Sequence, residues 1–368
     1  MGKIWTVIGG GNGGHATAGQ LGLNNQTVRI YDIFEDTVNT INKQGGIHVE
    51  GELEGFAPVE FATTDIGKAI EGADVIIVVT PAFAHADIAK KSAPYLKGNQ
   101  KLLLHPGTMF GSIEFLNILH EHGNDENLLI GEAVSLLYAA RLVEKGRVRI
   151  LGIKNSLPIA TIPSDRVTEM TEVLAPIFPQ MGRALANVLE SGLQNPNCVV
   201  HPLPTLLCTS LIESGREWLY YYDGISQSVG HAACALDKER ISIGKALGLD
   251  IMSIEDFYLD MYNVEADTLA EVTNKVKAYA GVKGHSSVNT RYLLEDIPYS
   301  IIPMIGLAKM LGIDVPIMES TVVLSQAVLQ KDFSKEARTI EQVGIADMDK
   351  EQLLEFVKTG KHYSHASH

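Results

Sequence analysis

Cysteine is scarce in this sequence. The chain of 368 residues has three cysteines, Cys198, Cys208 and Cys234. Their odd number and the lack of a C-x-x-C spacing argue against a disulfide framework and against a cysteine-based zinc site. We therefore expect a reduced, cytoplasmic protein without a bound metal. The closing HYSHASH segment has three histidines, but nothing upstream offers them a metal-binding partner.

Long hydrophobic runs and a surplus of basic charge are also absent. No apolar run approaches the roughly 18 residues that suggest a membrane helix, and the first residues lack the pattern of a secretory signal. The net charge of −14 argues against nucleic acid and anionic membranes as partners, because both reward basic patches. What remains is an ordinary globular composition, whose length predicts about two domains.

A glycine-rich loop stands at the start of the chain. The apolar stretch KIWTVI, of strand length, runs into GGGNGGHATAGQL, where Gly9, Gly11 and Gly14 fit the G-x-G-x-x-G pattern. In a dinucleotide-binding turn these glycines permit the tight turn, the approach of the pyrophosphate, and close packing of helix on strand. Asn12 and Gly13 begin the helix, whose N-terminus offers hydrogen-bond donors and a positive dipole to the phosphates.

An acidic residue ends the next expected strand. Asp32 follows the segment TVRIY, where a carboxylate accepts hydrogen bonds from the adenosine ribose hydroxyls. The next residues, Ile33 and Phe34, have no positive charge to pair with a 2′-phosphate. The pattern therefore predicts NAD as the cofactor in preference to NADP.

Strand-like and helix-like segments then alternate, which predicts a doubly wound, mostly parallel sheet. The apolar run over residues 74–79 is typical of a buried parallel strand. Because ligands bind outside the carboxyl ends of such strands, we expect Thr80, Pro81, Ala82 and Phe83 to lie beside the nicotinamide half of the cofactor.

The pattern changes after about residue 185. Beyond this point the apolar periodicity is helical and no further clear strand is visible. We predict an NAD-binding α/β domain over residues 1–185 and an all-α domain over residues 186–368. The longest expected helix covers residues 225–248, and the acidic, aromatic stretch 250–265 is expected to form a solvated pair of helices.

One histidine is surrounded by prolines, in the segment NPNCVVHPLP. Proline fixes its own φ and disfavours the α region for the residue before it, so we expect His201 to be extended. By itself this residue fits a packed core histidine as well as an acid–base catalyst.

A second polar cluster contains Arg291 and Asp296. A guanidinium matches a carboxylate with two parallel hydrogen bonds, and an aspartate beside a histidine fixes its tautomer. The alternative is that Arg291 and Glu295, four residues apart on a helix, form a surface ion pair.

Seven motifs, in this order, resemble those of the octopine/nopaline (opine) dehydrogenase family. They span nearly the whole chain and are GGGNGGHATAGQL, TPAFAH, HPGTMFG, GEAVSLLYAAR, NPNCVVHP, YYYDGISQSVG and NTRYLLEDIPYSIIP. The resemblance implies a Rossmann domain followed by a helical domain like that of 6-phosphogluconate dehydrogenase. It further implies that His201 is the acid–base catalyst, that Asp296 is its partner, and that Arg291 binds the substrate carboxylate.

The resemblance also implies a reaction. An α-keto acid, pyruvate in much of the family, condenses with the amino group of an amino acid, and NADH reduces the product; the reverse oxidation also occurs. Two alternatives stay open: a hydroxyacid dehydrogenase similar to ketopantoate reductase, and an NAD-binding sensor without turnover. The expected partners are small molecules, and the sequence is compatible with a homodimer.

Overall fold

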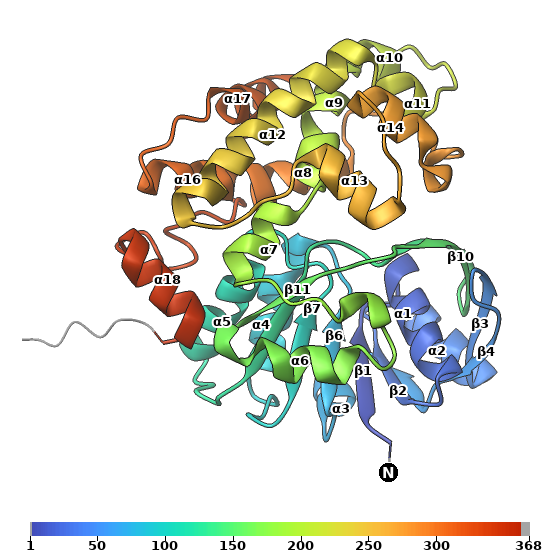
Figure 1. The fold of residues 1–368 in the computed structure, drawn as a ribbon. Coiled ribbons are helices and arrows are strands. Elements are labelled where there is room, and N and C mark those ends of the chain that lie inside the picture. Colours follow the sequence, from blue (N-terminus) through green and yellow to red (C-terminus); the bar gives the residue numbers. More distant parts are fainter. Residues whose placement is uncertain (1, 362–368) are drawn as a thin grey trace, which may run out of the picture. The chain divides into compact units, whose positions relative to one another are not determined.

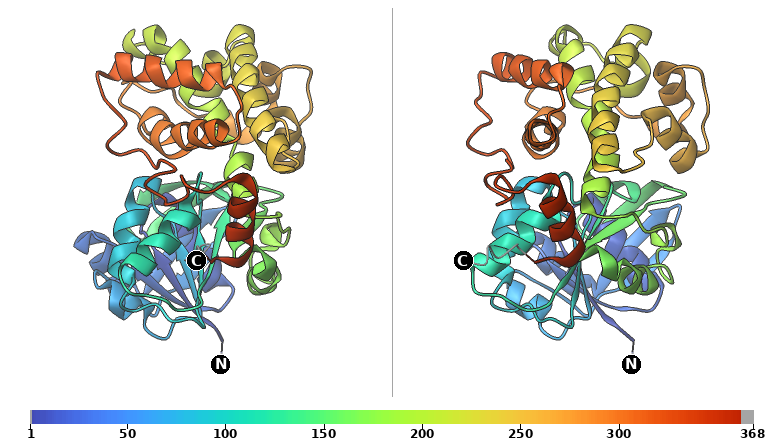
Figure 2. Two further views of the ribbon diagram at one scale, coloured as in Figure 1. Left: turned by 90° about the vertical axis from the view of Figure 1, so that its left-hand side faces the viewer. Right: turned by 60° about the vertical axis from the view of Figure 1, so that its left-hand side comes forward.

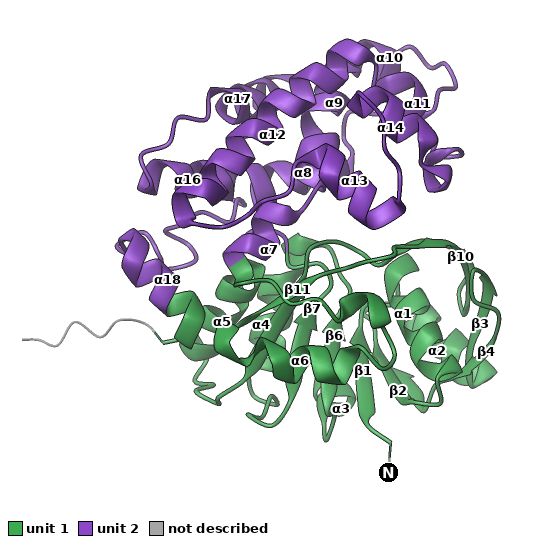
Figure 3. Cartoon of the chain, in the orientation of Figure 1, with its two compact units in different colours: residues 1–107, 111–188, 356–368 green, residues 108–110, 189–355 purple. Residues whose placement is uncertain are grey.

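The computed structural model describes residues 2–361 and forms two compact units (Figure 3). Unit 1 comprises residues up to 107, residues 111–188 and the chain from 356; unit 2 comprises 108–110 and 189–355. The histidine-containing HYSHASH tail lies outside the described residues. Within residues 2–361, none of the helices combines the length and the apolar character that crossing a membrane requires.

The observed division differs from the predicted one, 1–185 and 186–368, in two places. The short loop 108–110 belongs to unit 2, because the buried Arg338 donates hydrogen bonds to Thr108 Oγ1 (2.8 Å) and to the Met109 carbonyl (2.9 Å). The chain from 356 groups with unit 1 instead of the helical unit. Both assignments depend on contacts between distant residues, which local sequence patterns do not record.

Unit 1 is built on a seven-stranded sheet with the order β11-β8-β7-β6-β1-β2-β5 (Figure 1). Its pairs are parallel, except that β11 is antiparallel to β8. The predicted doubly wound, mostly parallel sheet is therefore confirmed. The strands are β1 Ile4–Ile8, β2 Thr27–Tyr31, β5 Phe61–Thr63, β6 Val75–Val78, β7 Lys101–Leu104, β8 Leu129–Ala133 and β11 Ile159–Ile162.

A second sheet in unit 1, with the order β4-β3-β10-β9, was not predicted. Its strands are β3 Gly46–Gly51, β4 Gly55–Pro58, β9 Tyr138–Glu144 and β10 Arg147–Ile153. Helix α1 contacts strands of both sheets, and most of its small residues are buried. The sequence did not show β9, because its exposed, charged positions interrupt any apolar run.

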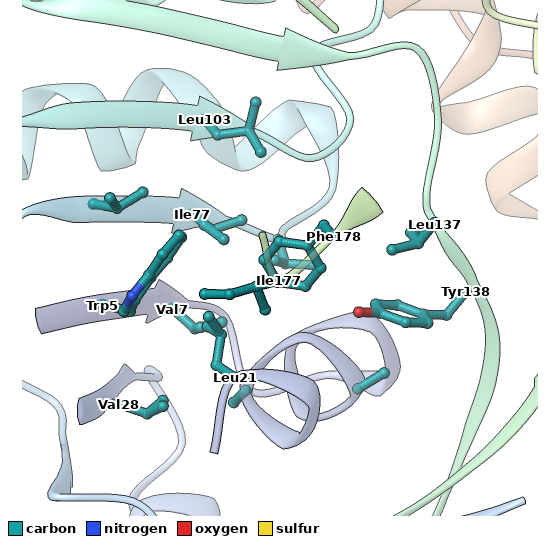
Figure 4. Packing of buried hydrophobic residues seen from close by; sticks show 14 of the residues in the cluster. Trp5, Val7, Leu21, Val28, Ile77, Leu103, Leu137, Tyr138, Ile177 and Phe178 are labelled. Carbon is teal, nitrogen blue, oxygen red and sulfur yellow. The ribbon is translucent and has the colours of Figure 1, made fainter. Parts of the chain in front are cut away.

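Helices α1 to α5 connect strands of unit 1, and α6 follows the last strand, β11. They are α1 Asn12–Leu23, α2 Glu35–Gln44, α3 Ile66–Ile70, α4 His85–Ser92, α5 Gly111–Glu121 and α6 Val167–Leu174, with the 3₁₀ turns η1 Ala82–Ala84, η2 Ser164–Arg166 and η3 Pro179–Met181. The core lies between helices and sheet (Figure 4). There the fully buried Trp5 meets the ring of Phe178 edge to face, with 6.3 Å between the ring centroids.

The regular elements of unit 2 are helices, as Figure 2 shows for the yellow to orange part of the chain. They are α8 Asn197–Val200, α9 Pro202–Leu207, α10 Thr209–Glu213, α11 Tyr220–Gly224, α12 Gln227–Leu247, α13 Ile254–Tyr262, α14 Leu269–Lys275, η4 Lys277–Tyr279, α15 Arg291–Leu294, η5 Ile297–Ile301, α16 Ile302–Met310 and α17 Pro316–Leu329. Helices α7 Val188–Gln194 and α18 Lys350–Thr359 cross the boundaries between the units.

Two predictions about unit 2 had different outcomes. Helix α12 agrees with the helix expected over 225–248, since Ser226 caps its start and Gly248 ends it with a positive φ of 77°. The solvated helix pair expected over 250–265 was wrong. This stretch contains the single helix α13, which buries Phe257 and Tyr258. Their rings pack into an aromatic cluster that also contains Tyr221, Tyr262 and Tyr279.

Candidate active site

The glycine loop of unit 1 has the geometry of a phosphate-binding turn. Gly9 has a φ of +110°, and a Cβ atom there would lie 2.4 Å from the Val79 carbonyl oxygen. A Cβ on Gly14 would collide with the carbonyl of Gly9 at 1.7 Å, whereas one on Gly11 would have no neighbour within 4 Å. Gly11 also provides no side-chain cap for α1. At the start of α1, the first N–H groups are therefore available as donors to an anionic group, and there is open space beside Gly11 for that group.

The carboxylate of Asp32, just beyond β2, is held against this loop. The residue is 7% exposed; its Oδ2 accepts a hydrogen bond from the Gly10 N–H, and its Oδ1 accepts one from the Phe34 N–H at 2.8 Å. Each carboxylate oxygen has a further lone pair. The arrangement therefore fits a ribose whose hydroxyls donate to the same carboxylate.

The segment after β6 lies at the point where the strand order reverses, since β1 pairs with β2 on one side and with β6 on the other. Ligands of doubly wound sheets bind at such a point. Thr80 Oγ1 is buried there without a hydrogen-bond partner in the described part of the chain. Pro81 leads into the turn η1, which contains Ala82 and the exposed Phe83. These positions fit the nicotinamide half of a dinucleotide.

Two other predicted cofactor residues have neighbours within unit 1. The Asn12 side-chain oxygen accepts a hydrogen bond from the Leu142 N–H at 2.8 Å, so this oxygen holds β9. A Cβ atom on Gly13 would meet the side chains of Val79 and Leu136. Asn12 can therefore serve a cofactor through its backbone at the helix start more readily than through its side-chain oxygen.

Sequence reasoning missed the buried Lys154, which directly follows β10 and lies near His105 at the carboxyl end of β7. The Lys154 ammonium donates a hydrogen bond to Ser135 Oγ, and burial lowers the pKa of Lys154 to about 7. Nearby, His105 Nε2 accepts a hydrogen bond from the Leu137 N–H at 2.9 Å. Burial, with a smaller effect of the Lys154 charge, lowers the pKa of His105 to about 3. His105 is therefore a neutral acceptor at physiological pH.

In unit 2, His201 lies at a kink between α8 and α9. Its φ of −107° and ψ of −68° are in the α region, so the prediction of an extended residue was wrong. The contacts at the kink override the local preference set by Pro202: the Tyr220 hydroxyl donates to the carbonyls of Val200 (3.1 Å) and His201 (3.0 Å). Pro202 instead begins α9, a position that suits its fixed φ.

The imidazole of His201 has a partner on each nitrogen and on one face. Its Nδ1 lies 2.9 Å from Asp296 Oδ2, its Nε2 lies 3.4 Å from the Tyr221 hydroxyl, and Tyr292 stacks on the ring with 3.5 Å between centroids and 7° between planes. His201 and Asp296 are 8% and 5% exposed. Because an ionised carboxylate only accepts hydrogen bonds, Nδ1 carries the proton, and Nε2 is the nitrogen that can exchange one.

Arg291, the first residue of α15, forms the ion pair that was the alternative expectation. Its Nε and Nη2 both donate to Glu295 Oε2, the first at 2.8 Å. Its side chain is 67% exposed, whereas that of Glu295 is 11% exposed. Arg291 also immediately precedes Tyr292, which stacks on His201. The structure thus brings His201 and Asp296 into direct contact, and places Arg291 one residue from their aromatic neighbour.

Three tyrosines around His201 were not identified as site residues from the sequence. Tyr220, Tyr221 and Tyr292 each contact its ring or backbone. The available signals were the segment YYYDG, which forms α11, and the motif NTRYLLEDIPYSIIP, which contains Tyr292.

Comparisons with known proteins cover both units. A family profile described as NAD/NADP octopine/nopaline dehydrogenase, alpha-helical domain, matches residues 184–329, and one described as NAD-dependent glycerol-3-phosphate dehydrogenase N-terminus matches residues 4–107. The opine dehydrogenase of Arthrobacter sp. (strain 1C) is 38% identical over 347 residues, which cover 94% of this chain and 96% of that protein.

Solved structures show the same fold. Octopine dehydrogenase with NADH and L-arginine has a TM-score of 0.79 at 23% identity, covering 99% of both chains. Yersinopine dehydrogenase with bound NADP⁺ has a TM-score of 0.74 at 15% identity, covering 97% of this chain and 98% of its own. A ketopantoate reductase from Ralstonia eutropha JMP134 has a lower TM-score, 0.62 at 16% identity, covering 90% of this chain and 99% of its own.

Proposed function

The chain belongs to the octopine/nopaline (opine) dehydrogenase family, and from this premise we propose that it condenses pyruvate with the amino group of an amino acid in an NADH-dependent reduction. The observation that supports this best is the buried His201–Asp296 pair of unit 2, with Nδ1 and Oδ2 2.9 Å apart. A histidine oriented by a carboxylate is the usual form of a positioned acid–base catalyst.

His201 donates and accepts the protons that the condensation requires. When the neutral amine adds to the keto carbon, the imidazolium gives its Nε2 proton to the former carbonyl oxygen, and the neutral ring then takes a proton from the newly bonded nitrogen. The ring gives this second proton to the resulting hydroxyl, which leaves as water as the C=N bond forms, and in the reverse reaction each proton returns by the same path. Asp296 stabilises the positive charge on the ring in the protonated state. A dinucleotide held by the glycine loop and Asp32 would supply the hydride that reduces the C=N carbon.

Arg291 would hold the carboxylate of the keto acid. Glu295 binds the Nε and Nη2 groups of its guanidinium, which leaves Nη1 on the exposed side chain for a substrate oxygen. Positioning of this kind lowers the barrier because the reacting groups no longer need to find their orientation. Glu295 then fixes the orientation of the Arg291 guanidinium, and the substrate binds to the edge of the guanidinium that carries Nη1.

We further propose that NAD is preferred over NADP. Asp32 is a buried carboxylate at the end of β2, where a 2′-phosphate would be repelled. The next two residues, Ile33 and Phe34, are 64% exposed and uncharged, so they offer no positive group to such a phosphate.

The test is an NADH-oxidation screen of pyruvate and 2-oxoglutarate with each of the twenty amino acids. We expect oxidation only when a keto acid and an amino acid are both present. Oxidation with a keto acid alone would favour the hydroxyacid dehydrogenase alternative. Tight NADH binding without oxidation in any combination would favour the sensor.

A further inference from the structure

The nitrogen of His201 that exchanges the proton faces one particular hydroxyl, that of Tyr221. We propose that Tyr221 is a catalytic residue: its hydroxyl is the second hydrogen-bond donor to the substrate oxygen that receives the proton from His201. This inference rests on the proposed function, because it concerns the same oxygen of the condensing keto acid.

The distance between the two groups supports a shared acceptor. The Tyr221 hydroxyl lies 3.4 Å from His201 Nε2, at the outer limit of a direct hydrogen bond. Two donors at this separation can both reach one oxygen placed about 2.8 Å from each. Such pairs of donors stabilise the negative charge that develops on a carbonyl oxygen during addition.

The surroundings of Tyr221 keep its hydroxyl in the donor form and in place. The residue is 5% exposed, and burial raises the pKa of its phenol well above the ordinary value. The phenol therefore stays protonated over the whole range in which an imidazole titrates. Its ring stacks on Tyr279, with 3.7 Å between the centroids and 8° between the planes, which restricts the direction in which the hydroxyl points.

The neighbouring Tyr220 shows what a structural tyrosine looks like here. Its hydroxyl bonds to Thr205 Oγ1 at 2.9 Å and to two backbone carbonyls at the kink, so its role is to hold the backbone of His201. The Tyr221 hydroxyl instead lies beside the nitrogen that transfers the proton, and it also has a side-chain hydrogen bond with Tyr292. The two adjacent tyrosines thus have different roles.

The experiment compares Tyr221→Phe with Tyr221→Met in the amine-dependent NADH-oxidation assay. The phenylalanine keeps the ring and its stack, whereas the methionine loses both. A donor role predicts that kcat falls about 10²-fold in each variant, while KM for the keto acid and the Kd of NADH stay within about threefold. The pH dependence of kcat should keep its shape, because the His201–Asp296 pair is intact.

Tyr262→Phe is the matched control. Tyr262 belongs to the same aromatic cluster and its ring meets those of Tyr258 and Tyr279, so the variant removes a hydroxyl from that cluster but not the one beside His201. Its kcat should stay within about twofold of wild type. A role of Tyr221 in ring packing alone predicts a different pattern: normal kcat for Tyr221→Phe, with a loss only in Tyr221→Met.

The outcomes separate the two proposals. An active wild-type enzyme whose Tyr221→Phe variant keeps kcat within threefold would overturn the donor role and leave the proposed function standing. A wild-type enzyme that is silent with every pair of keto acid and amino acid would overturn both.

Discussion

Nδ1 of His201 and Oδ2 of Asp296 lie 2.9 Å apart although 95 residues separate them in the sequence. The kink between α8 and α9 supplies the imidazole, and the residue before η5 supplies the carboxylate. Because both groups are buried, the carboxylate has little water to bind and interacts mainly with the ring. This pair decides which nitrogen of His201 is available for catalysis.

Replacing the histidine should remove catalysis without unfolding the protein. We expect His201→Asn to bind NADH normally and to lose roughly 10²–10⁴-fold in kcat, the usual contribution of a positioned acid–base group. Steady-state kinetics and NADH titration measure the two quantities. A core histidine would give the opposite result, a lower melting temperature with near-normal turnover, and a soluble variant that keeps more than about a tenth of wild-type kcat would contradict the mechanism.

Replacing the aspartate should have a smaller effect of a different kind. Asp296→Asn removes the negative charge that favours the imidazolium, so the rate of reductive condensation should begin to fall at a lower pH than in wild type. We expect a loss in kcat smaller than that of His201→Asn. The measurement is the pH profile of kcat from about pH 5 to 9. An unchanged profile would mean that Asp296 serves only to orient the ring.

The proposed binding of the keto acid carboxylate by Arg291 can be tested with a variant that keeps the positive charge but lacks the planar guanidinium. Arg291→Lys should raise KM for the keto acid at least ~10-fold, since a hydrogen bond to a charged group contributes on the order of 1.5–3 kcal/mol, and should leave NADH affinity unchanged. Glu295→Gln is the control for the internal ion pair. If Arg291 serves only that pair, both variants should change stability alike and neither should change KM.

The cofactor preference should respond to the charge at the end of β2. Asp32→Ser combined with Ile33→Arg should shift the ratio of kcat/KM for NADH and NADPH towards NADPH by at least ~10-fold, because repulsion is replaced by an ion pair. Ile33→Arg alone, which keeps the carboxylate, should shift it less. An unchanged ratio in the double variant would show that Asp32 does not contact the ribose.

The buried lysine of unit 1 predicts a dependence of stability on pH. Burial lowers the pKa of Lys154 to about 7 from its ordinary 10.5, so between these pH values the unfolded chain binds more protons than the folded one. The contribution of Lys154 to the free energy of unfolding therefore increases as pH rises from 7 towards 10.5, and it does not change with pH below 7. Lys154→Met should be most stabilising relative to wild type at or below pH 7, and this advantage should shrink as pH rises.

Denaturant unfolding at several pH values measures that difference. Lys145→Met is the control, because the Lys145 side chain is 49% exposed and its ammonium lies 3.0 Å from Asp36 Oδ2 at the surface. Its stability difference from wild type should change little over the same range. A Lys154→Met curve parallel to that of wild type would mean that the ammonium of Lys154 is solvated.

The sequence alone determined the parts of this protein that depend on local patterns. The turn at Gly9 needs a positive φ, and the close contact at Gly14 excludes a side chain, so the glycine loop with Asp32 after the next strand was visible as a motif. Alternating apolar runs predicted the parallel sheet, because period and length differ between strands and helices. The resemblance of the motifs to one family then pointed to His201, Asp296 and Arg291.

Only the tertiary structure decided how these residues meet. Proline neighbours predicted an extended His201, but the hydroxyl of Tyr220 holds the kink in which the residue lies. The second sheet, the transfer of loop 108–110 to unit 2 through Arg338, and the placement of Tyr221 beside Nε2 all arise from contacts between residues far apart in the chain. Such contacts form because burial and hydrogen bonding over the whole fold outweigh local preferences of well under a few kcal/mol, and no pattern within one segment records them.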